Sequence, residues 1–169
     1  MRRRRRVAGA TVGLLVIVGV SACSDGASVS GSDAAADRQA RVAERGATVM
    51  PFDQDRTTHI FRATETGGVQ RVVADDADAS RQVRLIRAHL REEADRFSAG
   101  DFTDPMAIHG AQMPGIRALR SGADRIGVEY SSIPRGAQLT YATTDPDLVA
   151  ALHDWFDAQL MDHGSHAHD

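Results

Sequence analysis

The sequence predicts an α+β domain with a four-stranded, mainly antiparallel sheet and helices packed on one face of that sheet. Two pairs of β-rich runs, at 57–74 and 126–141, each flank a turn. The segments between and after them carry apolar residues three and four positions apart, the spacing of amphipathic helices. The expected order is β-β-α-α-β-β-α, and hairpins combined with helices are typical of this class. We expect one domain over residues 48–163.

The first hairpin is expected from the runs 57–63 and 69–74, which flank the turn residues Thr66-Gly67-Gly68. Side chains alternate between the two faces of a strand, so His59, Phe61 and Ala63 share one face. Burial of Phe61 would therefore direct His59 towards the core or its rim.

A long helix is expected over residues 79–99, because one stripe of it is apolar and Gly100 is a natural C-terminal stop. The stripe consists of Val83, Ile86, Leu90, Ala94 and Phe97. His89 and Glu93 lie one helical turn apart on the border of this stripe. They are therefore placed between core and solvent.

The second half of the chain repeats hairpin and helix signals. Residues 101–113 are expected to form an irregular loop that carries His109, and Pro114 opens a short helix that ends at residues 121–122. Apolar residues alternate on both sides of the turn at 134–136, which predicts a second hairpin. Asp145-Pro146 then offers a cap and a first-turn proline for an apolar last helix.

The N-terminal segment resembles the signal peptide and lipobox of bacterial lipoproteins. Residues 2–6 are arginines, residues 7–20 are apolar, and Val20-Ser21-Ala22-Cys23 follows. The expected signal peptide is 1–22, and the lipidated Cys23 would anchor the chain on the extracytoplasmic face of the membrane. The alternative is an uncleaved N-terminal anchor, although the apolar run is short for a span of about 20 residues.

Composition limits the partners and the tether. Cleavage would leave 15 arginines against 23 acidic residues, a net charge near −8, which makes nucleic acid an unsuitable partner. The single cysteine excludes an internal disulfide. Residues 24–45 are rich in Ser, Ala, Gly and Asp, so we expect a flexible tether over 23–47, with a short helix near 34–43 as an alternative.

Several motifs of the domain resemble a family of small bacterial proteins often named aspartate carbamoyltransferase. The motifs are Met50-Pro-Phe-Asp, Thr57-Thr-His-Ile-Phe61, Ile86-Arg-Ala-His-Leu-Arg-Glu-Glu-Ala94, Gly100-Asp-Phe, Ile108-His-Gly-Ala-Gln-Met-Pro-Gly115 and Trp155-Phe-Asp-Ala-Gln-Leu-Met-Asp-His-Gly164. The resemblance spans residues 50–164 and implies a shared domain, not an activity. A transcarbamylase has a phosphate loop resembling Ser-x-Arg-Thr at a helix N-terminus, and no run here matches it.

Three histidines and one glutamate form the candidate metal site. His59, His89, Glu93 and His109 come from a strand, a helix and a loop, and Met113 (or Met106) adds a thioether. Imidazole with thioether favours copper, and imidazole with carboxylate suits zinc or copper. The alternative is that His89 and Glu93 are an i,i+4 pair and that the other histidines are structural.

The C-terminal residues 164–169 form a tail, and together with the preceding His163 this end of the chain is rich in histidine. His163, His166 and His168 are able to chelate copper, nickel or zinc weakly without a fold. The alternatives are a solvated tail and a His163 that packs at the end of the last helix.

The sequence therefore predicts a membrane-tethered extracytoplasmic lipoprotein with a small ligand-binding domain, its ligand a transition metal such as copper or zinc. Two other hypotheses stay open. One is a structural or partner-binding lipoprotein that recognises an extracytoplasmic protein. The other is an enzyme of unknown class, for which no catalytic motif such as Gly-x-Ser-x-Gly is present.

The lipobox generates the first testable prediction. Replacing Cys23 with Ser should leave the precursor uncleaved or release the domain from the membrane, because the acceptor thiol is missing. Membrane fractionation and mass spectrometry of the N-terminus measure this. A Cys23→Ser chain that matures and stays membrane-bound like the wild type would show that the lipobox interpretation is wrong.

Overall fold

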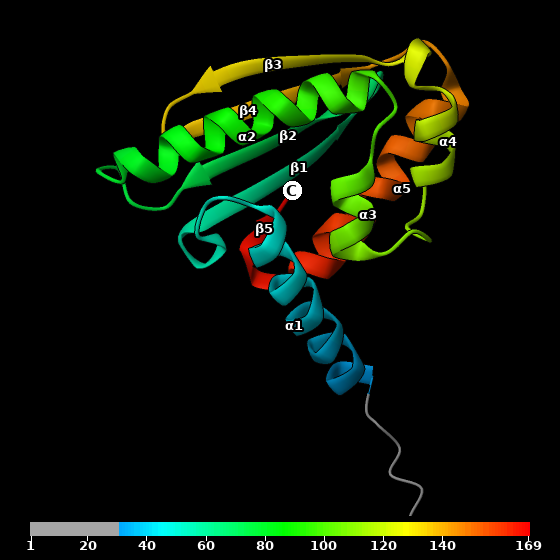
Figure 1. Cartoon of the computed structure of the whole chain (residues 1–169). Helices are drawn as coiled ribbons and strands as arrows, with labels where there is room; N and C mark the ends of the chain where they lie inside the picture. The colour runs from blue at the N-terminus through cyan, green and yellow to red at the C-terminus, as the bar shows by residue number, and fades with distance from the viewer. Residues whose placement is uncertain (1–30) are drawn as a thin grey trace, which may run out of the picture.

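The computed structural model describes residues 31–169, which fold into a mixed α+β structure (Figure 1). The helices are α1 (Gly31–Val49), α2 (Ser80–Ser98), α3 (Thr103–His109), α4 (Ile116–Ser121) and α5 (Pro146–His163). The strands are β1 (Thr57–Thr64), β2 (Gly67–Ala74), β3 (Gly127–Ile133), β4 (Gly136–Ala142) and β5 (Ala167–His168). Short 3₁₀ turns lie at Gln54–Arg56, Ala123–Arg125 and Gly164–His166.

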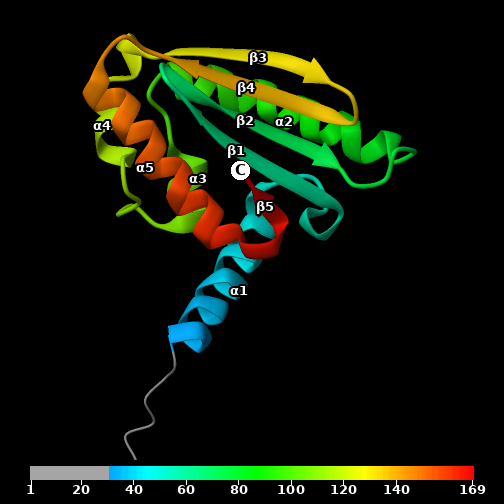
Figure 2. The ribbon, with the colours of Figure 1, turned by 180° about the vertical axis from the view of Figure 1, so that it is seen from behind.

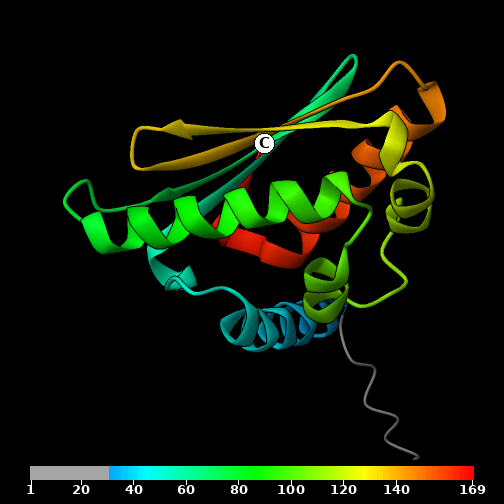
Figure 3. The same cartoon turned by 45° about the horizontal axis from the view of Figure 1, so that its top comes forward.

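The strands form one sheet in the order β3-β4-β2-β1-β5. The first four strands pair antiparallel, and β5 pairs parallel to β1. The register places His59 opposite Val72, and Val72 opposite Ala137, so these three buried side chains share one face. Helix α2 packs over β2, β3 and β4, while α5 packs over β1 and β2, as the turned view shows (Figure 3).

The α+β class is confirmed, but the predicted four-stranded antiparallel sheet is wrong in one respect. The sheet of residues 31–169 has a fifth strand, β5, whose two residues pair with His59 and Ile60. A two-residue strand is too short to show alternation, so no sequence pattern marks it. Its parallel pairing places the C-terminal tail beside β1.

Two helices occupy segments that were expected to be irregular. Helix α3 lies within the predicted loop 101–113; it has only seven residues, and the Asp101 side chain accepts a hydrogen bond from the Thr103 amide at 2.9 Å. Helix α1 covers residues 31–47 of the predicted tether, where a short helix near 34–43 was the alternative, and it packs against α3 and α5 (Figure 2). Only Val42 and Gly46 of α1 are buried. The segment is therefore mostly polar, and its composition did not indicate that one side of it packs against the domain.

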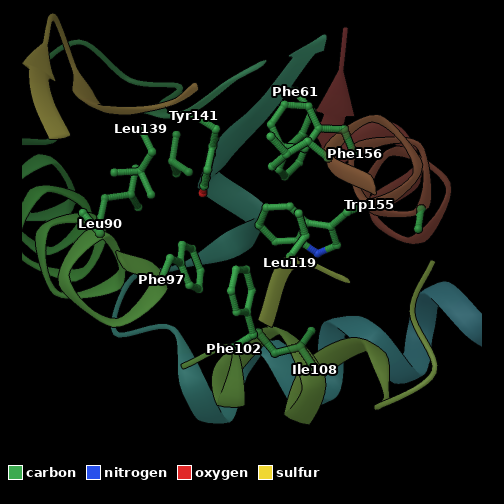
Figure 4. Packing of buried hydrophobic residues seen from close by; sticks show 14 of the residues in the cluster. Phe61, Leu90, Phe97, Phe102, Ile108, Leu119, Leu139, Tyr141, Trp155 and Phe156 are labelled. Atoms are coloured by element: carbon green, nitrogen blue, oxygen red, sulfur yellow. The ribbon is translucent and has the colours of Figure 1, made fainter. Parts of the chain in front are cut away.

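Trp155 of α5 stands at the centre of the core, among aromatic rings from several elements (Figure 4). Its ring meets Phe97, Phe102 and Tyr141 edge to face, with centroids 5.7–5.8 Å apart. Each such pair contributes about 0.5–1.5 kcal/mol beyond the burial of its area. These contacts join α2, the start of α3, β4 and α5.

Two glycines allow α5 to approach its neighbours closely. A Cβ at Gly68 of β2 would lie 2.3 Å from Cε2 of Phe156, and one at Gly115 would lie 2.0 Å from the Ala151 carbonyl oxygen. Gly115 also has a φ of +73°, which favours glycine. These contacts fix how α5 lies across the sheet, and so where its C-terminal residue His163 sits.

The predicted signal peptide 1–22, the lipidated Cys23 and the start of the tether lie outside the described residues. Within residues 31–169, no helix combines the length and the apolar character needed to cross a membrane.

Helix α1 generates a prediction that separates a docked helix from a flexible tether. Replacing Val42, which is 1 % exposed, with Ala should lower the free energy of unfolding by about 1–3 kcal/mol, because buried methyl groups are lost. Denaturant titration of the full chain measures this. Arg41→Ala, on the exposed side of the same helix, is the control and should change little. Equal stabilities for both variants would mean that α1 is not part of the packed domain.

Candidate functional site

A small pocket brings together the four residues that the sequence singled out most strongly. His59 of β1, His89 and Glu93 of α2, and His109 of α3 all line one cavity of about 50 Å³. His163, the last residue of α5, Asp104 of α3, and the amides of Gln70 and Gln159 also line it. Its apolar wall includes Met50, Phe52, Phe61, Leu90, Phe97, Ile108 and Trp155. We call this cavity the histidine pocket.

The histidines form a group of three with a fourth on the far side of Phe52. The rings of His59 and His163 are stacked, with centroids 4.8 Å apart and planes at 24°. The rings of His109 and His163 meet edge to face at 5.1 Å. Phe52 lies between His59, at 6.2 Å, and His89, at 5.7 Å. His89 therefore belongs to the end of the pocket that holds the carboxyl groups.

Burial keeps these imidazoles neutral. It lowers the pKa of His59 to about 4, with a further contribution from the neighbouring His109 and His89. Burial also lowers the pKa of His89, and it brings the pKa of His163 well below its ordinary value. A neutral imidazole has a nitrogen lone pair to offer, which is the form that binds metal ions or accepts protons.

His109 is held by a carboxylate that sequence reasoning did not identify. Its Nδ1 lies 2.9 Å from Oδ2 of Asp162, and both side chains are buried. An ionised carboxylate only accepts hydrogen bonds, so Nδ1 carries the proton and Nε2 carries the lone pair. Burial lowers the pKa of His109, and Asp162 partly offsets that effect.

Asp162 is in turn bound by Arg38 of α1. The Arg38 Nε donates to Oδ1 at 2.5 Å, and its Nη2 donates to Oδ2 at 2.8 Å. The sequence marked neither residue, because Arg38 falls in the polar segment assigned to the tether. The only signal for Asp162 is its position next to His163.

At the other end of the pocket, Glu93 and Asp104 form a carboxyl pair. Burial raises the pKa of Glu93 to about 8, helped by the charge and hydrogen bonding of Asp104 and opposed by Arg96. Arg96 lies 2.9 Å from Asp104 and 3.9 Å from Glu93. Glu93 is therefore protonated at neutral pH, while Arg96 pairs with Asp104, another residue that the sequence did not mark.

Three polar atoms of pocket residues have no hydrogen-bond partner within residues 31–169. They are Nε2 of His59, Oε1 of Glu93 and Nε1 of Trp155. A buried polar group without a partner costs about 1–3 kcal/mol. Such groups are usually satisfied by water or by a ligand. Their convergence on one cavity marks the histidine pocket as the best candidate site.

The other candidate ligands lie elsewhere. Met113 lines a separate cavity between α4 and α5. His166 lines an outer cavity of about 220 Å³, walled by α1 and Gly164–His166, which shares His59 and His163 with the histidine pocket. His168 is exposed on β5.

Among the described residues, no three His, Cys, Asp or Glu side chains already stand in the positions of metal ligands. The metal site therefore stays a prediction.

Glu93 generates a prediction about pH and stability. Its folded pKa of about 8 lies above the ordinary 4.5, so the unfolded chain loses this proton first and the folded state loses stability as pH rises from about 4.5 to 8. Glu93→Gln removes this effect and keeps a hydrogen-bond donor. The variant should be more stable than the wild type by roughly 2–5 kcal/mol at pH 8 and similar to it near pH 4.5.

Glu92→Gln is the matched control, because Glu92 is an exposed neighbour on the same helix. Its unfolding free energy should follow that of the wild type at every pH. A Glu93→Gln variant that shows no pH-dependent gain would mean that Glu93 is ionised in the folded protein.

Comparisons with protein-family models, with curated proteins and with solved structures found no match to this chain.

Proposed function

We propose that this protein is a membrane-tethered extracytoplasmic lipoprotein whose domain binds a transition metal ion in the histidine pocket. The observation that carries the proposal is that His59, His89, Glu93 and His109, from three elements far apart in the chain, line one cavity with His163. Side chains of this kind are costly to bury, and a bound ion would compensate that cost.

The chemistry of the pocket favours copper or zinc. Neutral imidazole nitrogens with one carboxyl group are ligands of borderline metals, whereas Ca²⁺ and Mg²⁺ require mostly oxygen ligands. A cavity of about 50 Å³ suits an ion with a water molecule better than an organic cofactor. His109 is already supported from behind by Asp162, as metal-binding histidines usually are.

Binding would require side chains to turn. No three of the described His, Cys, Asp or Glu side chains stand in ligand positions, so at least one pocket side chain must rotate about its bonds. Glu93 would also release its proton to become a ligand, so affinity should rise with pH until that proton is lost.

Lipidation at Cys23 would hold the pocket close to the membrane. Helix α1 begins at Gly31, so seven residues separate it from Cys23. Seven residues reach at most about 25 Å when fully extended. The domain would therefore stay near the membrane surface, closer than the longer tether predicted over 23–47 would allow.

Metal titration tests the proposal. The full chain, freed of metal, should bind one Zn²⁺ or Cu²⁺ ion and gain thermal stability. His59→Ala and His89→Ala should each weaken binding at least about tenfold, since each removes a ligand. Calorimetric titration at neutral pH measures both effects.

His153→Ala is the control, because His153 binds the carbonyl oxygens of Thr64 and Gly67 and does not line the pocket. Its affinity should equal that of the wild type. His168→Ala should likewise change nothing. If the wild type binds neither ion, the pocket histidines are internal structure, and the alternative of a partner-binding lipoprotein becomes the better description.

A further inference from the structure

We propose that Arg38 and Asp162 are positioning residues for His109, which makes helix α1 part of the metal site. This inference deepens the proposed function and rests on it for its metal-binding consequence. Neither residue is a ligand: Asp162 acts on the ring of His109, and Arg38 acts on Asp162.

The geometry points to this role because Asp162 lies behind the ring. Asp162 does not line the histidine pocket, whereas His109 does. The hydrogen bond of 2.9 Å from Nδ1 to Oδ2 therefore engages the edge of the His109 ring that is turned away from the pocket. Nε2, the nitrogen with the lone pair, is then left to face the cavity.

Charge explains why Arg38 is needed. The Asp162 side chain is 3 % exposed, and its histidine partner is neutral, so a second group must compensate the buried negative charge. Arg38 does so through two nitrogens, one to each carboxylate oxygen, which also fixes the plane of the carboxylate. Without Arg38, the Asp162 carboxylate would be free to rotate, and its hydrogen bond to His109 would weaken.

The position of Arg38 links this contact to the docking of α1. Its neighbour Gln39 donates to the Met161 carbonyl oxygen at 3.0 Å, and Val42 one turn later is buried. The helix that follows the proposed lipid anchor thus carries the residue that orients a metal ligand.

The test uses the full chain and begins without metal. Nitrogen NMR of labelled histidine should show His109 with a proton on Nδ1 and none on Nε2 in the wild type. In Arg38→Ala and in Asp162→Asn, the His109 signals should change to a mixture of both tautomers. The affinity for Zn²⁺ should fall by about 10–100-fold in both variants.

Gln39→Ala is the matched control, because it removes a contact between α1 and α5 that does not reach His109. It should keep the wild-type tautomer and affinity, which separates positioning from the docking of α1 in general. Arg38→Lys restores the charge without the paired donors and should recover only part of the affinity. Arg38 is half-exposed, so Arg38→Ala should fold even if Asp162→Asn does not.

Unchanged His109 signals in folded Arg38→Ala would overturn the proposal, whether or not the wild type binds Zn²⁺. Altered signals with unchanged Zn²⁺ affinity would overturn it as well, because His109 would then not be a positioned ligand. A wild type that binds no metal but whose tautomer depends on Arg38 would contradict the proposed function alone and support the positioning of His109.

Discussion

The burial of ionisable side chains around one small cavity is the constraint on which the rest of this structure depends. Four imidazoles and two carboxyl groups line a space that the domain could have filled with apolar residues. Each buried polar group without a full set of partners costs about 1–3 kcal/mol. The aromatic packing around Trp155 offsets that cost, because it binds α2, α3, β4 and α5 into the wall of the pocket. The core is therefore arranged to hold the site.

The ionisable groups in and around the pocket avoid an unbalanced charge in two ways. Burial lowers the pKa of the histidines and raises that of Glu93, so all of these groups are uncharged at neutral pH. Asp104, which lines the pocket, and Asp162, which lies behind His109, are paired with Arg96 and Arg38 instead. The stability effects have opposite signs. As pH falls from 6.5 towards 4, His59 costs stability because the unfolded chain binds its proton first. As pH rises above 4.5, Glu93 also lowers the stability, because the unfolded chain loses the carboxyl proton first.

The sequence predicted the parts of the fold that repeat a pattern. The alternation in β1, β2 and β4 and the stripe of α2 placed His59, His89 and Glu93 on inward or bordering faces, and all three line the histidine pocket. His109 was anticipated as a site residue, although the short helix that carries it was not. Arg38, Asp104 and Asp162 could not be found in this way. Their roles come from contacts between distant segments, such as the 124 positions that separate Arg38 from Asp162. The periodicity of apolar residues along a sequence reports local structure and does not reveal such a contact.

The helix ends around the pocket favour a cation over an anion. His109 and His163 are the last residues of α3 and α5, so both reach the pocket from helix C-termini. Free carbonyl groups make a helix C-terminus partly negative, which favours a nearby cation by about 0.3–1 kcal/mol. Phosphate sites use the opposite end, where free N–H groups face the ligand. Arg38 and Arg96 are already paired with Asp162 and Asp104. No arginine is among the residues that line the histidine pocket, so the charge of an anionic ligand such as carbamoyl phosphate would not be compensated there. A metal ion would meet neutral imidazoles, a releasable proton on Glu93 and two negative helix ends.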